Sequence, residues 1–176
     1  MNKKIKRIAV IGPESTGKTT LCRELADHFK TVWVPEYARE YVEKLARPYT
    51  FSDIELCAKK QLEQEDELLQ KANQFIFCDT ELIVAKVWCE DVFKTCPASI
   101  ENEISKRKYD LYLLTIPDLP FKEDPVRENP HRREYFFELY KRELEERGFA
   151  YEIIRGKNNS RSENAMKIIK KSFLIN

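Results

Sequence analysis

The apolar residues of the chain fall into short runs that alternate with longer stretches of helical periodicity. Five short runs predict β-strands, at residues 5–11, 31–35, 74–79, 109–116 and 151–156. Apolar positions that recur every three or four residues predict helices at 18–30, 36–46, 53–72, 81–93, 132–148 and 162–174. Alternating strands and helices are typical of βαβ units, so the pattern predicts an α/β fold with a parallel sheet.

Turn and cap residues mark the ends of these elements. Ser52 and Glu55 have the spacing of a capping box at the start of the third helix. Gly148 is placed to end the predicted helix 132–148. Four prolines keep the polar segment 117–133 out of a helix: Pro117, Pro120, Pro125 and Pro130. No repeat, low-complexity tract or linker interrupts the chain, so we expect one domain over residues 1–176.

Composition narrows the class of protein. The chain is 42% hydrophobic and 35% charged, as expected for a globular protein, and its formal charge of +1 argues against nucleic acid or an anionic membrane as partner. The apolar run near the N-terminus is about five residues long, too short for a signal peptide or membrane anchor. Five cysteines without a C-x-x-C pair predict reduced thiols, and hence a cytoplasmic protein.

The strongest chemical signal is the segment from Gly12 to Thr19, which matches G-x-x-x-x-G-K-T at the predicted strand-to-helix junction. Glycines allow backbone amides to surround a phosphate, Lys18 is placed for the β- and γ-phosphates of ATP, and the Thr19 hydroxyl is a ligand for Mg²⁺. An ordinary turn is the alternative. The predicted nucleotide contacts of the loop are Gly12, Glu14, Ser15, Thr16, Gly17, Lys18, Thr19 and Thr20.

Asp79 ends a predicted strand, at the sheet edge where α/β proteins bind ligands. It is a candidate metal and catalytic residue, and the alternative is that it caps the helix that follows. Thr80 comes next, so the Asp-Glu pair of motor ATPases is missing, and there is no N-K-x-D sequence for guanine. We expect the loop around Asn158 to lie beside the adenine of ATP, although a simple polar turn also explains its composition.

The proline-rich segment 117–133 has the features of a lid. Kinases of small molecules exclude water with such a lid and neutralise the transferring phosphoryl group with cations. Arg127 and Arg132 are the candidate catalytic arginines, with Arg127 preferred, and Arg133 is expected to be a surface residue. The alternative is a solvated helix start whose arginines are neutralised by nearby acids.

The segment after the second strand contains the candidate acceptor site. Glu36 could bind a ribose hydroxyl or accept the proton of an attacking 5′-hydroxyl, and the sequence leaves both Glu36 and Asp79 as candidates for the base. Arg39 follows one helical turn later. Tyr37 and Trp88 are candidates to stack on a planar base, and Trp33 is a further aromatic neighbour. The alternatives are a helix-start role for Glu36 and core positions for the tryptophans.

Several of these segments together resemble the ribosylnicotinamide kinase domain of the bacterial NadR family, over roughly residues 6–173: GPESTGKTTL, PEYAREY, TFSDIELCAKKQLEQED, FCDT and PFKEDPVRENPHRREYF. The resemblance implies a P-loop kinase fold with a five-stranded parallel sheet of order 2-3-1-4-5, an arginine-containing lid, and a relation to thymidylate and deoxynucleoside kinases. It also implies ATP-dependent phosphorylation of nicotinamide riboside on its 5′-hydroxyl, giving nicotinamide mononucleotide. Pro35 stands where some family members have an aromatic residue.

The DNA-binding and nucleotidylyltransferase domains of full-length NadR proteins have no counterpart in the matched segments. Three other functions fit the same motifs: a kinase for another nucleoside or small nucleotide, an ATPase or nucleotide-controlled switch, and a module that binds ATP without catalysis. The sequence leaves the oligomeric state open.

Overall fold

The sheet is built from the five predicted strands. The computed structural model describes residues 4–124 and 129–174. Its strands run parallel in the order β2-β3-β1-β4-β5, which confirms the order that the resemblance implied. They are β1 (Lys6–Ile11), β2 (Val32–Val34), β3 (Phe75–Asp79), β4 (Leu111–Thr115) and β5 (Tyr151–Ile154).

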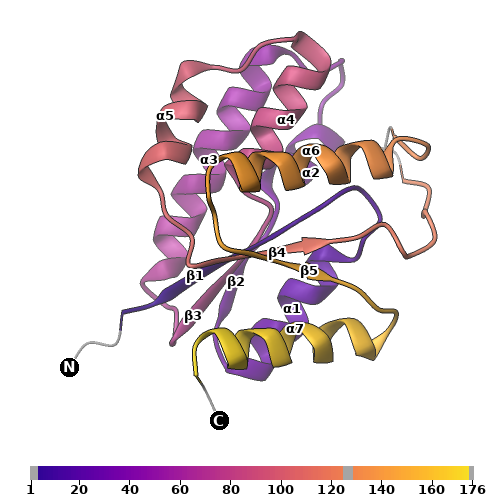
Figure 1. Ribbon diagram of the computed structural model, residues 1–176. Helices are drawn as coiled ribbons and strands as arrows, with labels where there is room; N and C mark the ends of the chain where they lie inside the picture. The colour runs from indigo at the N-terminus through magenta and orange to yellow at the C-terminus, as the bar shows by residue number, and fades with distance from the viewer. Residues whose placement is uncertain (1–3, 125–128, 175–176) are drawn as a thin grey trace.

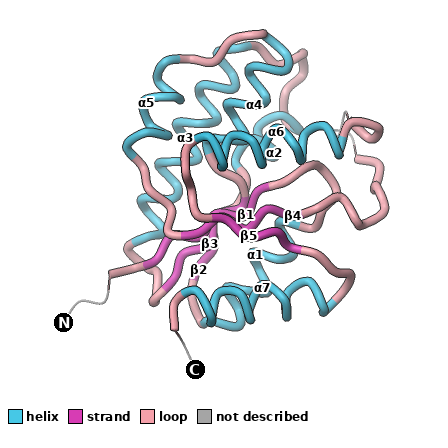
Figure 2. Tube along the Cα trace, viewed as in Figure 1, coloured by secondary structure: helices cyan, strands magenta, loops and turns pink. Residues whose placement is uncertain are grey.

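Helices cover both faces of the sheet, as Figures 1 and 2 show: α1 and α7 lie on one face, and α3, α4, α5 and α6 lie on the other. Their bounds are α1 (Lys18–Phe29), α2 (Tyr37–Glu43), α3 (Phe51–Leu69), α4 (Leu82–Phe93), α5 (Ala98–Lys106), α6 (Arg133–Glu146) and α7 (Asn159–Ser172). The central strands are therefore buried on both sides, which explains why they read as continuous apolar runs rather than alternating ones.

Two apolar clusters form most of the core. One packs α1 and α7 on the sheet around Leu21, Leu25 and Ile169, and the other packs α3 to α6 on the opposite face around Ile54, Ile83 and Leu144. Four cysteines are buried, the fifth is partly buried, and all five are free thiols, as expected. None of the helices in the described residues is long and apolar enough to cross a membrane.

Two local features differ from the prediction. The helix α5 was not predicted, although Ile100 and Ile104 form its buried face one turn apart. The capping box of α3 consists of Thr50 and Asp53, and not of Ser52 and Glu55, because the helix begins at Phe51, two residues earlier than a cap at Ser52 would place it. The Asp53 carboxylate also accepts hydrogen bonds from Arg47 and Tyr41, so it joins the start of α3 to α2.

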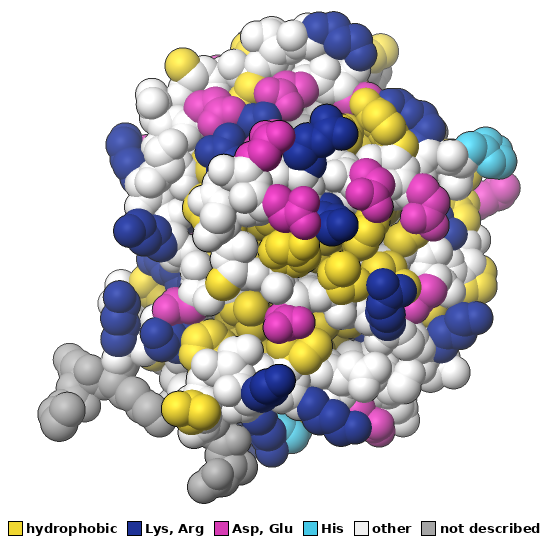
Figure 3. Space-filling view, viewed as in Figure 1, with side chains coloured by type: hydrophobic (Ala, Val, Ile, Leu, Met, Phe, Trp, Pro, Cys, Tyr) yellow, Lys and Arg dark blue, Asp and Glu magenta, His cyan; other side chains and the backbone are white. Residues whose placement is uncertain are grey.

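The face of the molecule shown in Figure 3 carries side chains of both charges. On the face shown in Figure 3, acidic and basic side chains are interspersed and do not form a basic patch.

The carboxyl ends of all five parallel strands meet at one edge of the sheet. The phosphate loop follows the central strand β1, so it lies in the middle of that edge.

Candidate active site

The loop between β1 and α1 is packed tightly against the end of β4. A Cβ atom on Gly12, whose φ is +144°, would lie 2.2 Å from Thr115 Oγ1 and 2.6 Å from the Thr115 carbonyl oxygen, so only glycine fits. The buried Thr16 hydroxyl donates to the Pro13 carbonyl at 2.8 Å and is hydrogen-bonded to Thr115 Oγ1 at 2.7 Å. The loop is thus held in shape by its neighbours in the protein.

Lys18 lies over this loop at the start of α1. Its ammonium donates to the carbonyl oxygens of Gly12 and Pro13, both at 2.9 Å. Gly17, with φ +77°, takes the left-handed conformation immediately before the helix. A cation and a helix N-terminus at the same loop form a suitable site for phosphate.

Thr19 and Asp79 form the candidate metal site. Thr19 Oγ1 donates to Asp79 Oδ2 at 2.5 Å, whereas Asp79 Oδ1 is buried and has no hydrogen-bond partner among residues 4–124 and 129–174. Burial raises the pKa of Asp79, and Lys18 and Thr19 oppose that rise. No group of three His, Cys, Asp or Glu side chains suited to a metal occurs in the described part of the chain. Mg²⁺ keeps several water ligands and needs few protein ligands, so a hydroxyl and a carboxylate with an unused oxygen fit it.

Asp79 does not cap the helix that follows it. The N-cap of α4 is Glu81, whose Oε1 accepts the Ile83 N–H at 2.9 Å. Burial raises the pKa of Glu81 to about 8. The cap role that the sequence left open for Asp79 therefore belongs to Glu81.

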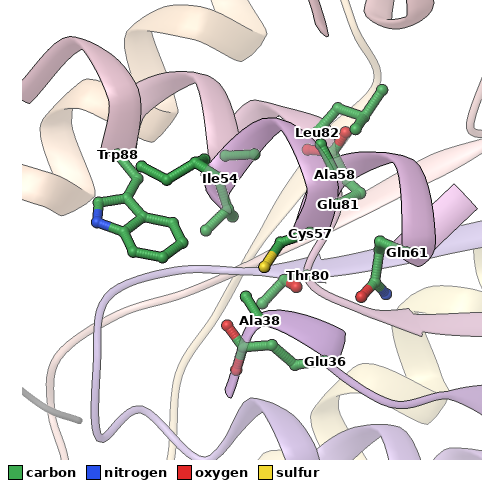
Figure 4. A pocket seen from close by; sticks show the side chains of 12 residues that line it. Glu36, Ala38, Ile54, Cys57, Ala58, Gln61, Thr80, Glu81, Leu82 and Trp88 are labelled. Atoms are coloured by element: carbon green, nitrogen blue, oxygen red, sulfur yellow. The ribbon is translucent and has the colours of Figure 1, made fainter. Parts of the chain in front are cut away.

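Glu36 opens onto a pocket between α2, α3 and the start of α4 (Figure 4). Burial raises its pKa to about 7, and the nearby Lys18 and Asp79 act on it in opposite directions. Most of the other lining side chains are apolar. The lining residues are Glu36, Ala38, Ile54, Cys57, Ala58, Gln61, Thr80, Glu81, Leu82, Val84, Ala85 and Trp88.

The structure separates the predicted aromatic residues. Trp88 forms one wall of the pocket and packs edge-on against Tyr49, with ring centroids 4.8 Å apart. Tyr37 does not line the pocket and stacks on Tyr41 instead. Trp33 packs against the core cluster on the α1 side. Trp88 is therefore the aromatic residue of the three that lines the pocket.

Gln61 and Glu81 line the pocket but were not among the predicted site residues. Gln61 Oε1 accepts the Tyr37 backbone N–H at 2.8 Å, which fixes the first residue of α2 against α3. A signal for Gln61 exists in the sequence, since it continues the spacing of Ile54 and Cys57 on the buried side of α3. Glu81 is the first residue of the helix predicted at 81–93, and nothing in its sequence context indicates that it lines a pocket.

The segment 117–133, which the sequence predicts to be a lid, is hydrogen-bonded to the phosphate loop in its described part. The Ser15 hydroxyl donates to the Lys122 carbonyl at 3.3 Å and accepts the Lys122 N–H at 3.1 Å. Glu14 Oε2 accepts the Asn129 N–H at 3.1 Å. The side chains of Glu14 and Ser15, which were predicted to bind nucleotide, therefore contact the lid.

The arginines of the lid are arranged differently from the prediction. Arg127 lies outside the described residues. Arg132 donates to Asp91 on α4 at 2.5 and 2.9 Å, so its guanidinium is bound to α4. Arg133, expected at the surface, is partly buried and donates to the Leu119 carbonyl at 2.8 Å and to the Ser15 carbonyl at 3.4 Å. Arg133 is thus the described lid arginine that contacts the phosphate loop.

Two further predicted residues have clear positions. Arg39 forms ion pairs with Asp124 in the lid and with Glu43, the latter at 3.2 Å, so it bridges α2 and the lid. Asn158 is the N-cap of α7 with φ +51°, and its side chain is exposed and makes no cap hydrogen bond. Its expected place beside an adenine stays a prediction.

Comparison with curated proteins finds relatives that agree with the sequence resemblance. The chain is 28% identical over 129 residues to the trifunctional NAD biosynthesis/regulator protein NadR of Escherichia coli (strain K12), and equally to that of Salmonella typhimurium. Each alignment covers 70% of this chain and 31% of the relative. The chain thus matches less than a third of these longer proteins.

Comparison with solved structures shows which folds resemble that of this chain. A crystal structure of NadR protein in complex with NAD and AMP-PNP superimposes with a TM-score of 0.80 at 25% identity, over 98% of this chain and 50% of that one. A NadR structure in complex with NR has a TM-score of 0.81 at 26% identity, over 96% and 50%. A deoxyadenosine kinase from M. mycoides, at 14% identity and a TM-score of 0.61 over 94% and 99%, shares the fold alone.

The family model described as AAA domain matches residues 7–161, which include the phosphate loop, Asp79 and the start of α7. The expected resemblance to NadR is confirmed by both comparisons. The chain belongs to the AAA domain family, with a P-loop fold like that of the NadR structures.

Proposed function

We propose that this protein is an ATP-dependent kinase that phosphorylates the 5′-hydroxyl of nicotinamide riboside and yields nicotinamide mononucleotide. The observation that carries the proposal is the position of Glu36. This carboxyl group, whose pKa is near 7, lines an apolar pocket on one side and interacts electrostatically with Lys18 of the phosphate loop on the other. The similarity to a NadR structure in complex with NR supports the choice of acceptor.

The geometry supports the following roles for the residues in the proposed reaction. The loop from Gly12 to Thr19 binds the phosphates of ATP, with Lys18 beside the terminal ones. Thr19 and Asp79 hold Mg²⁺, which supplies positive charge to the phosphates when bound. Glu36 accepts the proton of the 5′-hydroxyl, and the oxygen of that hydroxyl forms a bond to the γ-phosphorus of ATP. The bond between the γ-phosphorus and the oxygen that bridges it to the β-phosphate breaks, which releases ADP.

Glu36 is favoured over Asp79 as the base. Asp79 already accepts the Thr19 hydroxyl at the candidate metal site, whereas Glu36 faces the pocket in which an acceptor would lie. Trp88 lines that pocket and offers an aromatic surface to the positively charged ring of nicotinamide riboside. The lid supplies Arg133 near the phosphate loop.

An acceptor panel tests the proposal. Initial rates of ADP formation with Mg·ATP are measured with nicotinamide riboside, deoxynucleosides and nucleoside monophosphates. We expect the highest kcat/KM for nicotinamide riboside. The Trp88→Leu variant is expected to raise the KM for the riboside roughly tenfold and to leave the KM for ATP unchanged, since a desolvated cation–π contact contributes up to about 2 kcal/mol.

Trp33→Leu is the matched control, because Trp33 packs against the α1 side of the core and not in the pocket. A clear preference for a neutral deoxynucleoside or a monophosphate would contradict the choice of acceptor. ADP formation at a rate indifferent to every acceptor would contradict the kinase itself and favour an ATPase.

A further inference from the structure

The phosphate loop divides the carboxyl edge of the sheet into two halves. The acceptor pocket lies on the side of β2 and β3, since it is lined from α2, α3 and the start of α4. The strands β4 and β5 lie on the other side of β1. If the last phosphate points toward Glu36, the nucleoside end of the same nucleotide must extend toward the loops that follow β4 and β5.

Arg161 joins these two loops. It lies in the first turn of α7, where its Nε donates to the Gly156 carbonyl at 3.0 Å and its Nη2 forms an ion pair with Asp118. Asp118 in turn accepts the Gly156 N–H at 2.9 Å. Three hydrogen bonds therefore connect the first residues of the lid with the loop after β5.

The same cluster reaches the phosphate loop. A Cβ atom on Gly17 would lie 3.2 Å from Leu119 Cδ1 and 4.0 Å from Arg161 Cδ. Leu119 follows Asp118 directly, so the Arg161–Asp118 pair also places the side chain that packs over Gly17. The Arg161 guanidinium thus connects the lid with the loop after β5, whereas the part of Arg161 near the phosphate loop is its aliphatic Cδ.

The buried position of the Arg161 guanidinium is energetically unfavourable. It is 5% exposed, and its Nη1 is buried without a hydrogen-bond partner in the described part of the chain. Burial lowers the pKa of Arg161, against the opposing effect of Asp118. An incompletely paired buried cation is unfavourable for stability, so packing alone is a poor explanation for it.

We propose that Arg161 is the positioning residue for the nucleoside half of the bound nucleotide. By holding Asp118 and Gly156 together it sets the distance between the loops after β4 and β5, which form the two walls of the base site. Arg161 itself acts through these loops and not by contact with the phosphates. The inference rests on the proposed nucleotide site and does not depend on which acceptor is phosphorylated.

Calorimetry with two ligands tests this role. Mg·ATP probes the whole site, and magnesium tripolyphosphate probes the phosphate loop without a nucleoside. Arg161→Lys keeps the charge and loses the planar fork that binds Asp118 and Gly156 together. We expect its affinity for ATP to fall roughly tenfold while that for tripolyphosphate stays within about a factor of two. Asp118→Asn should show the same selective loss.

Two further variants separate this inference from the proposed function. Lys18→Ala should weaken both ligands, and Arg142→Lys, an exposed arginine on α6, should weaken neither. Equal losses of ATP and tripolyphosphate in Arg161→Lys, or no loss of ATP, would overturn the positioning role. If Arg161→Lys unfolds below the assay temperature, Asp118→Asn decides by the same comparison. A failed acceptor panel would leave the selective loss intact and reject only the kinase.

Discussion

Glu36 lies just after β2 and Asp79 is the last residue of the neighbouring strand β3, yet their surroundings give them different chemistry. Burial raises the pKa of both carboxyl groups. Asp79 accepts a hydrogen bond from the Thr19 hydroxyl, whereas Glu36 lines the pocket between α2, α3 and α4. A carboxyl group with a pKa near 7 is matched to accept a proton from an alcohol at neutral pH. In the proposed mechanism Asp79 therefore binds the metal and Glu36 is the base.

This division predicts a pH dependence. Because Glu36 must be deprotonated to act as a base, kcat/KM should rise with pH and level off above its pKa of about 7. Glu36→Gln should lower kcat by roughly 100-fold or more and remove that rise. Rates measured from about pH 5.5 to about 8.5 check it. An unchanged profile in Glu36→Gln would assign the titration to another group.

The position and backbone conformation of the loop from Gly12 to Thr19 could be predicted from sequence, because the spacing of its two glycines defines that conformation. The functions of the lid arginines could not be separated in the same way. Arg132 and Arg133 are adjacent and chemically identical, and their roles depend on Asp91 and Leu119, which are distant in sequence. The helical spacing of Gln61 indicates that it is buried but not that it binds the Tyr37 N–H, and Arg161 was missed because its partners Asp118 and Gly156 lie in other segments.

The lid arginines can be told apart by substitution. Arg133→Ala should lower kcat by roughly 100-fold, because the Arg133 guanidinium donates to the Ser15 carbonyl of the phosphate loop. Arg132→Ala should have a smaller effect, since its guanidinium is bound to Asp91. Single-turnover kinetics with saturating ATP and riboside measure both. A larger loss in Arg132→Ala would mean that Arg132 leaves Asp91 during the reaction.

At the scale of the elements, the helices and strands predicted from periodicity are present, with shifted ends. The error at the start of α3 has a physical cause. Thr50, Ser52 and Asp53 all favour helix starts, and sequence alone does not decide which hydroxyl is the cap. The helix α5 follows Pro97 and is nine residues long, so its periodic pattern was too short to stand out.

The cap assignment predicts unequal effects of two similar substitutions. Thr50→Ala should lower the free energy of unfolding by about 1 kcal/mol, because it removes the hydroxyl that accepts the Asp53 N–H. Ser52→Ala, in the first turn of the same helix, is the control and should change it by less than about 0.5 kcal/mol. Urea denaturation followed by circular dichroism measures both values. A larger effect of Ser52→Ala would contradict the observed cap.

At the scale of the whole molecule, the alternation of strands and helices was sufficient to predict a parallel α/β sheet. Strand order was not contained in that pattern, because it depends on contacts between strands far apart in sequence. The resemblance to NadR supplied the order, and the structure confirmed it. That order places β1 in the centre, so the phosphate loop lies between the pocket lined by Glu36 on one side and the Arg161 cluster on the other.

The central claim is that this arrangement transfers the last phosphoryl group of ATP to a sugar hydroxyl. The most direct measurement follows the label of ATP carrying ³²P in its γ-phosphate, in the presence of magnesium and nicotinamide riboside. We predict that the label appears in nicotinamide mononucleotide, in equal amount to the ADP formed, and that Lys18→Ala abolishes both. Label released only as inorganic phosphate, at the same rate with and without the riboside, would contradict the claim.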